Sequence, residues 1–139
     1  MDLAEKQGVL IADFSIIEDL TERFSAIVDQ SRRAKPLPDD ARIEANLVPG
    51  CTSQVWLTGW LENGACQFRT DADAPTVKGV AVLLCDLYSD APPAEVIAIE
   101  PECVQALGID RILTPTRLNG LGQIRKRIRE IAESLSTKL

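Results

Sequence analysis

The dipeptide Asn63-Gly64 joins two segments in which apolar side chains recur at every second position. Asn-Gly favours the two-residue turn of a β-hairpin, because both residues adopt positive φ at low cost. Residues 54–61 and 65–70 carry the alternating pattern of strands with one face buried. The sequence therefore predicts two antiparallel strands in the middle of the chain, with Leu47-Val48 as a candidate third.

The segments on either side of this hairpin have helical spacing. From Phe14 apolar residues recur at intervals of three and four, with Asp13 as a candidate N-cap, which predicts one helix from 14 to about 33. The proline-rich segment 35–40 ends it.

Four helices are predicted after the hairpin: 75–89, 93–97, 100–107 and 118–135, with Gly108 in a left-handed conformation after the third. We expect an α+β fold in which a small antiparallel sheet of about three strands packs against helices. At 139 residues the chain is expected to form a single domain over 1–139.

Net charge and apolar patterning restrict the partners. The formal charge is −6 and the basic residues are dispersed, except for a cluster near the C-terminus, so nucleic acid and anionic membranes are not expected to bind. No secretory signal pattern opens the sequence and no apolar stretch is long enough to span a bilayer. We expect a cytoplasmic protein that is a monomer or a weak homodimer.

The chain contains four cysteines and no histidine. The cysteines are never closer than fifteen positions, so the spacing gives no support to a zinc or iron–sulfur site. Cys66 and Cys85 fall in phase with apolar neighbours and are expected in the core. Cys103 lies in the first turn of a short predicted helix, where the helix dipole could lower its pKa.

Cys51 follows a Pro-Gly turn and precedes the first strand of the hairpin. A turn of this kind favours an exposed sulfur, and thiol exchange needs a thiolate, access and a partner sulfur rather than an imidazole base. The alternative is a small apolar residue packed under the hairpin, because free cysteines are often buried. The sequence pattern alone leaves both interpretations open.

Three charged features are further candidates. Arg117 is predicted in the first turn of the last helix, where a cation opposes the helix dipole; it either pairs with an acidic neighbour or binds a thiolate, a persulfide or a partner's carboxylate. Asp71 and Asp73 precede a helix, where acidic caps are common. The cluster 125–129 is typical of a solvated helix face or a docking patch.

Four segments in order resemble the SufE/CsdE family of sulfur acceptors for cysteine desulfurases. Val48-Pro-Gly-Cys-Thr-Ser-Gln-Val-Trp56 resembles the active-site loop of that family, and 71–79 resembles its Asp-x-Asp-Ala-x-x-Val-Lys/Arg-Gly segment. Leu113-Thr-Pro-Thr-Arg117 and Asn119-Gly-Leu121 are similar to two segments at the start of its last helix. The resemblance spans most of the chain.

The resemblance implies a fold similar to that of the IscU-type iron–sulfur scaffolds. It also implies that Cys51 accepts persulfide sulfur from a SufS- or CsdA-like cysteine desulfurase, stimulates that enzyme, and passes the sulfur to a SufB-like cluster-assembly scaffold. The pyridoxal phosphate belongs to the desulfurase, and the protein itself needs no cofactor. By the same analogy Arg117 lies near the loop or the docking surface, Asp73 influences loop exposure, and Ser53 and Gln54 shape the loop.

Other classes of function account for fewer of these sequence features. An adaptor that activates a desulfurase allosterically, without carrying sulfur, is the main alternative. An iron–sulfur scaffold would need several ligands converging with Cys51, and a thiol peroxidase would need a nearby resolving cysteine.

Overall fold

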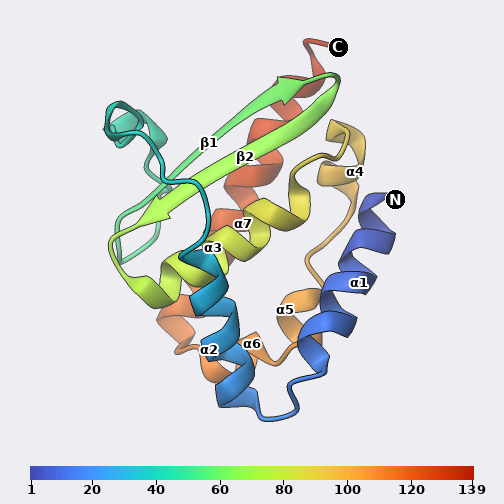
Figure 1. Cartoon of the computed structure of the whole chain (residues 1–139). Coiled ribbons are helices and arrows are strands. Elements are labelled where there is room, and N and C mark those ends of the chain that lie inside the picture. The colour runs from blue at the N-terminus through green and yellow to red at the C-terminus, as the bar shows by residue number, and fades with distance from the viewer.

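The computed structural model describes residues 1–139 as one β-hairpin with helices packed against one of its faces (Figure 1). The elements are α1 (Leu3–Ser15), α2 (Leu20–Ser31), the short 3₁₀ turns η1 (Asp39–Ala41) and η2 (Glu44–Asn46), β1 (Val55–Glu62), β2 (Ala65–Ala72), α3 (Pro75–Tyr88), α4 (Pro93–Ala98), α5 (Cys103–Ala106), α6 (Ile109–Ile112) and α7 (Pro115–Ser136). The prediction of an α+β fold is confirmed.

The hairpin forms at the predicted turn. Asn63 and Gly64 both have positive φ, and β1 pairs with β2 in antiparallel register from Val55↔Ala72 to Glu62↔Ala65. The expected third strand is wrong: Leu47 makes only an isolated bridge to Trp56, so the sheet has two strands. The 3₁₀ turn before Leu47 and the proline at position 49, which lacks an N–H, leave too few residues for a ladder.

Helix α3 occupies the centre of the molecule. It begins with Pro75 in its first turn and buries every residue from Gly79 to Cys85, followed by Leu87 and Tyr88. Its neighbours are β2, α2, α1 and α7, and α2 approaches it closely where Gly79 meets Val28. In Figure 1 α3 crosses beneath the hairpin with α2 on its other side.

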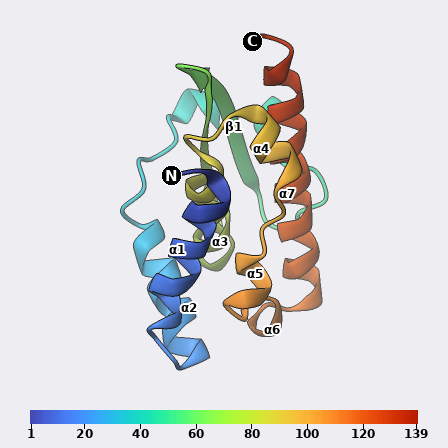
Figure 2. The same cartoon turned by 90° about the vertical axis from the view of Figure 1, so that its right-hand side faces the viewer.

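Helix α7 is the longest element and runs along one side of the molecule beside α4 (Figure 2). Its apolar stripe includes Leu121, Ile124, Ile128 and Leu135, as the sequence predicts. Arg125 departs from the expected solvated face. Its side chain lies 4.5 Å from the ring centre of Tyr88 and donates to the carbonyls of Ile97 and Ile99, which joins α7 to the C-terminal end of α4.

The predicted helix over 14–33 is wrong in its first part: α1 ends at Ser15, and α2 begins only at Leu20 and ends at Ser31. Asp2 and Asp19 cap them, accepting hydrogen bonds from the amides of Glu5 and Glu22. Each pair has the spacing of a capping box. Apolar residues keep a helical spacing across the break between the two helices, so this spacing alone does not reveal the break. The Asp19 cap shows where α2 begins.

The remaining predictions for helices hold within a few residues. Gly108 has φ of 76° between α5 and α6, in agreement with its expected left-handed conformation. The helices α1 and α6 lie outside the predicted set. No helix combines the length and apolar composition that crossing a membrane requires.

Replacing Gly59 by alanine should destabilise the protein. A Cβ at Gly59 would lie 2.6 Å from Cγ2 of Ile131 and 3.0 Å from the Phe68 ring, so the contact between sheet and α7 must shift. We expect a loss of about 1–3 kcal/mol in the free energy of unfolding, measured by urea denaturation.

Gly122→Ala is the matched control, because nothing lies within 4 Å of its added Cβ in the interior of α7. It should raise stability by about 0.5–1 kcal/mol through helix propensity. Equal effects of the two substitutions would contradict the packing between β1 and α7.

Candidate functional site

Cys51 lies in a short loop between Val48 and Val55, the first residue of β1. The loop is closed by a hydrogen bond of 2.8 Å from the Val48 amide to the Val55 carbonyl. The preceding Gly50 has φ of 84°, a conformation that favours glycine. The Cys51 side chain is half-buried rather than fully exposed, and it packs against the hydrophobic core. The expectation of a sulfur on an exposed bend is therefore met only in part.

The floor beneath this loop is the N-terminal part of α7. Sγ of Cys51 lies 3.5 Å from the carbonyl oxygen of Gly120, and a Cβ at Gly120 would lie 3.6 Å from that sulfur. A Cβ at Gly50 would lie 3.0 Å from Cγ of Gln123. Gly50 thus leaves room for the loop backbone beside Gln123, whereas a Cβ at Gly120 would make only ordinary van der Waals contact with the sulfur.

The surroundings of the thiol favour its neutral form. Burial raises the pKa of Cys51 above its ordinary value, because a thiolate loses solvation there. The S–H group can donate to the Gly120 carbonyl, which a thiolate cannot do. In this conformation Cys51 is a protonated thiol with low nucleophilicity.

Asp73 fastens the end of the loop to the end of β2. Its Oδ1 accepts a hydrogen bond from the Gln54 amide at 3.1 Å, and its own amide donates to the Gln54 carbonyl at 3.1 Å. It does not cap α3, whose N-cap residue is Ala74 and makes no side-chain cap bond. The prediction of acidic caps at Asp71 and Asp73 is therefore wrong.

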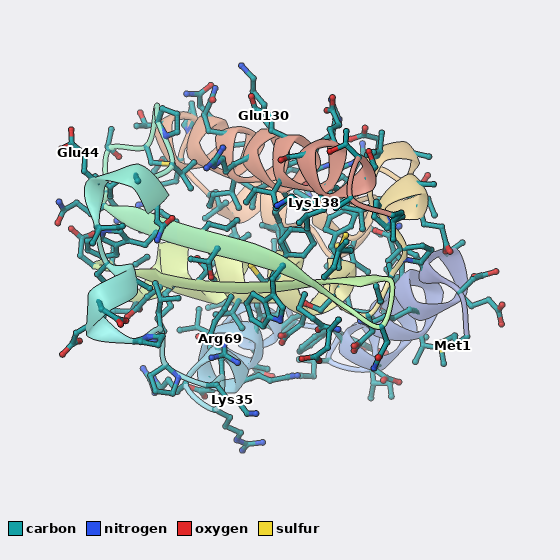
Figure 3. All side chains as sticks on the ribbon, turned by 90° about the horizontal axis from the view of Figure 1, so that it is seen from above. Met1, Lys35, Glu44, Arg69, Glu130 and Lys138 are labelled. Carbon is teal, nitrogen blue, oxygen red and sulfur yellow. The ribbon has the colours of Figure 1, made fainter.

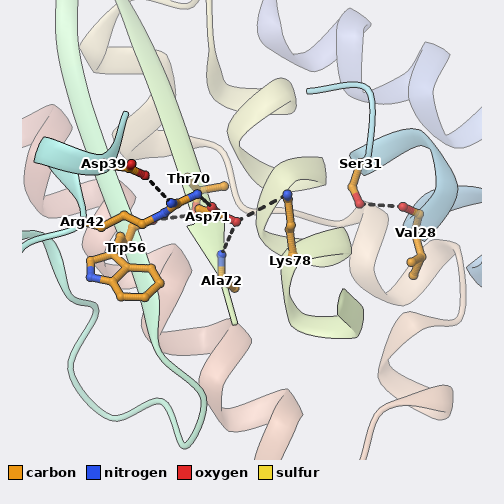
Figure 4. Close-up of polar contacts among 9 residues, drawn as sticks. All are labelled: Val28, Ser31, Asp39, Arg42, Trp56, Thr70, Asp71, Ala72 and Lys78. Carbon is orange, nitrogen blue, oxygen red and sulfur yellow. Dashed lines mark hydrogen bonds and ion pairs between the residues drawn. The ribbon is translucent and has the colours of Figure 1, made fainter. Parts of the chain in front are cut away.

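Asp71 fastens the segment that leads to the loop (Figure 4). Its buried carboxylate binds Arg42, accepts from the Ala72 amide at 2.8 Å and lies 3.4 Å from Nζ of Lys78. Burial opposes its charge, but the hydrogen bonds from Arg42 and Ala72 and the charges of Lys78 and Arg42 outweigh it, so the pKa of Asp71 is lowered. Asp71 and Asp73 therefore hold the chain both before and after Cys51.

Arg117 lies in the first turn of α7, as predicted, where its amide donates to Oγ1 of Thr114. Its half-buried side chain lines a small apolar hollow with Val77 and Leu121, and it takes part in none of the ion pairs of the chain. Arg117 precedes Gly120 by three residues, or about 4.5 Å along the helix axis. Arg117 is thus an unpaired cation about one helical turn before Gly120, and its side chain lies against the hollow rather than against Cys51.

The other three cysteines are all buried, as predicted for Cys66 and Cys85. Cys103 does begin a helix, but burial raises its pKa to about 11, opposed by weaker hydrogen bonds from its own amide and that of Val104. The suggested dipole effect therefore does not lower its pKa below the ordinary value. No three Cys, Asp or Glu side chains gather closely enough to hold a metal ion.

Sequence reasoning missed three residues that shape this site: Gly120 and Gln123 on α7, and Arg42 as the partner of Asp71. Gly120 stands in the sequence within Asn119-Gly-Leu121, and nothing in that segment indicates a contact with Cys51. Nothing local to Gln123 or Arg42 indicates a contact with residues so far along the chain.

The fold and the site define a small α+β protein that presents one accessible cysteine on a loop anchored by carboxylates. The family model described as "SufE: Fe-S metabolism associated domain" matches residues 9–132. An uncharacterised SufE-like protein of Synechocystis sp. is 32% identical over 117 residues, covering 84% of this chain and 74% of that protein. One from Rhizobium etli is 33% identical over 129 residues, covering 89% and 87%.

The chain belongs to the SufE family, which is associated with Fe–S metabolism. Its fold is also found in the solution structure of a hypothetical protein from Thermus thermophilus, with a TM-score of 0.78 over 95% of this chain and 96% of that one. The two sequences are 22% identical, so this likeness supports the fold alone.

The raised pKa of Cys51 should be visible in its alkylation. The reactive thiolate forms only as pH rises through a pKa above that of an ordinary cysteine, about 8.5. The rate of carbamidomethylation of the native protein, followed by intact mass, should therefore reach half its maximum above that pH. A midpoint below it would mean that a cation stabilises the thiolate. One sulfur should react in the native protein and four after denaturation.

Asp73→Ala should loosen the loop, because it removes the acceptor of the Gln54 amide. We expect Cys51 to be alkylated several-fold faster at pH 7.5, since local opening is controlled by few contacts. Asp73→Asn keeps an oxygen at the same place and is the matched control, with a rate near that of the wild type. Equal rates in all three proteins would show that the Asp73–Gln54 contact does not restrain Cys51.

Proposed function

We propose that this protein is a sulfur carrier that accepts persulfide sulfur from a cysteine desulfurase on Cys51. The observation that supports the proposal is the contrast among the four thiols: three are buried, while Cys51 alone lies at the surface, on a glycine-preceded loop, in a chain of the SufE family. Carriage of sulfur needs one accessible thiol and no resolving partner.

The transfer step is a thiol exchange. The Cys51 thiolate attacks the outer sulfur of the donor's persulfide and forms a new S–S bond. The donor's own S–S bond breaks, and the donor cysteine leaves as a thiolate. Cys51 then carries the outer sulfur as a persulfide, with its proton, and no oxidant or reductant is consumed.

The Cys51 thiol must move away from α7 before it reacts. Its hydrogen bond to Gly120 and its partial burial hold it there, while Gly50 provides the backbone freedom for an outward turn. Arg117, about one helical turn before Gly120, offers a positive charge that can stabilise the thiolate or the persulfide once the thiol has turned outward. Asp73 restrains the loop, and Ser53 and Gln54 set its shape between these contacts.

The partners follow from this chemistry. The donor is a pyridoxal-phosphate cysteine desulfurase, which supplies the cofactor and is stimulated when its persulfide is removed. The recipient is a scaffold on which iron–sulfur clusters assemble. Four free thiols suit a reducing compartment, so we place this role in the cytoplasm.

A second candidate is an adaptor that activates the desulfurase without carrying sulfur. One observation favours it: the Cys51 thiol is half-buried and its pKa is raised, which is unfavourable for a nucleophile. In that case the loop would serve only as a contact.

Intact-mass spectrometry separates the two candidates. The protein is incubated with a desulfurase, pyridoxal phosphate and free cysteine, with Cys51→Ser as the matched control. The carrier proposal expects a gain of one sulfur atom on the wild type that dithiothreitol reverses, and no gain on Cys51→Ser. It also expects the stimulation of desulfurase turnover to be lost with the thiol.

Undiminished stimulation by Cys51→Ser, with no sulfur gained by the wild type, would support the adaptor. A gain of sulfur on both proteins would place the acceptor at another cysteine. Either result overturns the proposal for Cys51.

A further inference from the structure

No α-helix covers the outer face of the hairpin. Only its Trp56–Asp71 end is partly covered, by the segment of η1 and η2, from which Arg42 binds Asp71. Trp56, Thr58 and Trp60 of β1 point to this face, opposite Asp71, Arg69 and Gln67 of β2. The helices pack on the other face, which carries Val55, Leu57 and Phe68. Figure 3 looks onto the uncovered face, with Arg69 projecting from its β2 side.

Both tryptophans of the chain therefore lie on this face, half-buried. The guanidinium of Arg69 stacks on the ring of Trp60 at 5.3 Å from its centre. The ring offers a surface for an apolar group of a partner, and the guanidinium beside it offers a site for a carboxylate. Tryptophan and arginine are both enriched at protein interfaces.

A recess of about 220 Å³ borders this face at the outer edge of β2. Arg69 lines it from the strand and Lys35 from the segment after α2, and Figure 3 shows these two residues on the same side of the sheet. Thr70 also lines the recess. The backbone amides of Cys66 and Phe68 point away from β1. In an antiparallel strand every second amide points to the same side, so the Thr70 amide also points away from β1, toward the recess.

The charges in the recess favour an anion. Neither Lys35 nor Arg69 takes part in any ion pair of the chain. The only acid in the lining is Asp86, and Lys6 lies beside it, donating to its carbonyl at 2.5 Å. In a protein of net charge −6, this is a local excess of positive charge next to an aromatic surface.

We propose that the uncovered hairpin face and this recess form the docking surface for the sulfur donor. The donor presents an apolar side chain to Trp60 and a carboxylate to Arg69 and Lys35. This inference rests on the proposed function, because it takes the donor to be the desulfurase that loads Cys51.

The distance to Cys51 is compatible with one interface. From Arg69 to Ala72, which pairs with Val55 at the exit of the Cys51 loop, β2 advances about 10 Å. A protein–protein interface of standard size buries about 800 Å² on each partner, which corresponds to a patch roughly 30 Å across. A single partner can therefore cover the recess, the tryptophans and the loop.

Binding is measured with the desulfurase that loads Cys51 in the mass experiment. Labelling with 5-fluorotryptophan gives two ¹⁹F resonances, and Trp60→Phe assigns them. The Trp60 resonance should shift when unlabelled desulfurase is added. Arg69→Glu and Lys35→Glu should each weaken the complex by about tenfold in Kd at low salt. Lys126→Glu, on the exposed side of α7, makes the same change in charge and should leave Kd unchanged.

Sulfur loading at saturating desulfurase shows that each variant is folded and that its site works. If the wild type is loaded but the Trp60 resonance does not move and Arg69→Glu binds normally, the docking surface is wrong and the proposed function stands. Weakening by Lys126→Glu alone would place the contact on α7 and also overturn it. If no desulfurase binds or loads the wild type, both proposals fail.

Discussion

The burial of most of the surface of α3 is the constraint on which the rest of the structure depends. A helix with apolar residues around most of its circumference must be enclosed, and here β2, α2, α1 and α7 enclose it, leaving Asp86 exposed. The close approach of Val28 to Gly79 fixes α2 against it. Because β2 lies on one side of α3 and α7 packs beside it, the strand end and the helix floor that flank Cys51 are held in one fixed relation.

The site divides between a rigid part and a part that is lightly held. Helix α7 is rigid at its centre, where Ile124 and Ile128 are fully buried and Arg125 stacks on Tyr88. The loop tip above it is held by one weak sulfur contact and the packing of Gln123. Asp71 anchors Arg42, Asp73 anchors Gln54, and the Val48 amide is bonded to the Val55 carbonyl between them, so movement is confined to the residues around Cys51 and the sulfur can turn outward without disturbing the core.

Much of this arrangement could be predicted from the sequence, where the controlling signals are local. The hairpin followed from Asn63-Gly64, and the turn after α5 from Gly108, because positive φ selects such residues. The predicted helix over 14–33 begins too early, because apolar spacing continues through a break that only the Asp19 cap marks. The partners of Cys51 and Asp71 could not be predicted, since Gly120 and Arg42 are distant in sequence and their contacts depend on how the helices and loops pack.

The burial of the other three cysteines has a consequence for the lifetime of any cargo. A persulfide decays most readily when a second thiol attacks it, releasing sulfide and leaving a disulfide. Cys66, Cys85 and Cys103 lie in the core and cannot reach the surface loop without unfolding. A persulfide on Cys51 is therefore protected from attack by the other thiols of the same chain. A sulfur atom held on Cys51 leaves at a rate set by the thiols that the surroundings bring to it, and the protein contributes none of its own.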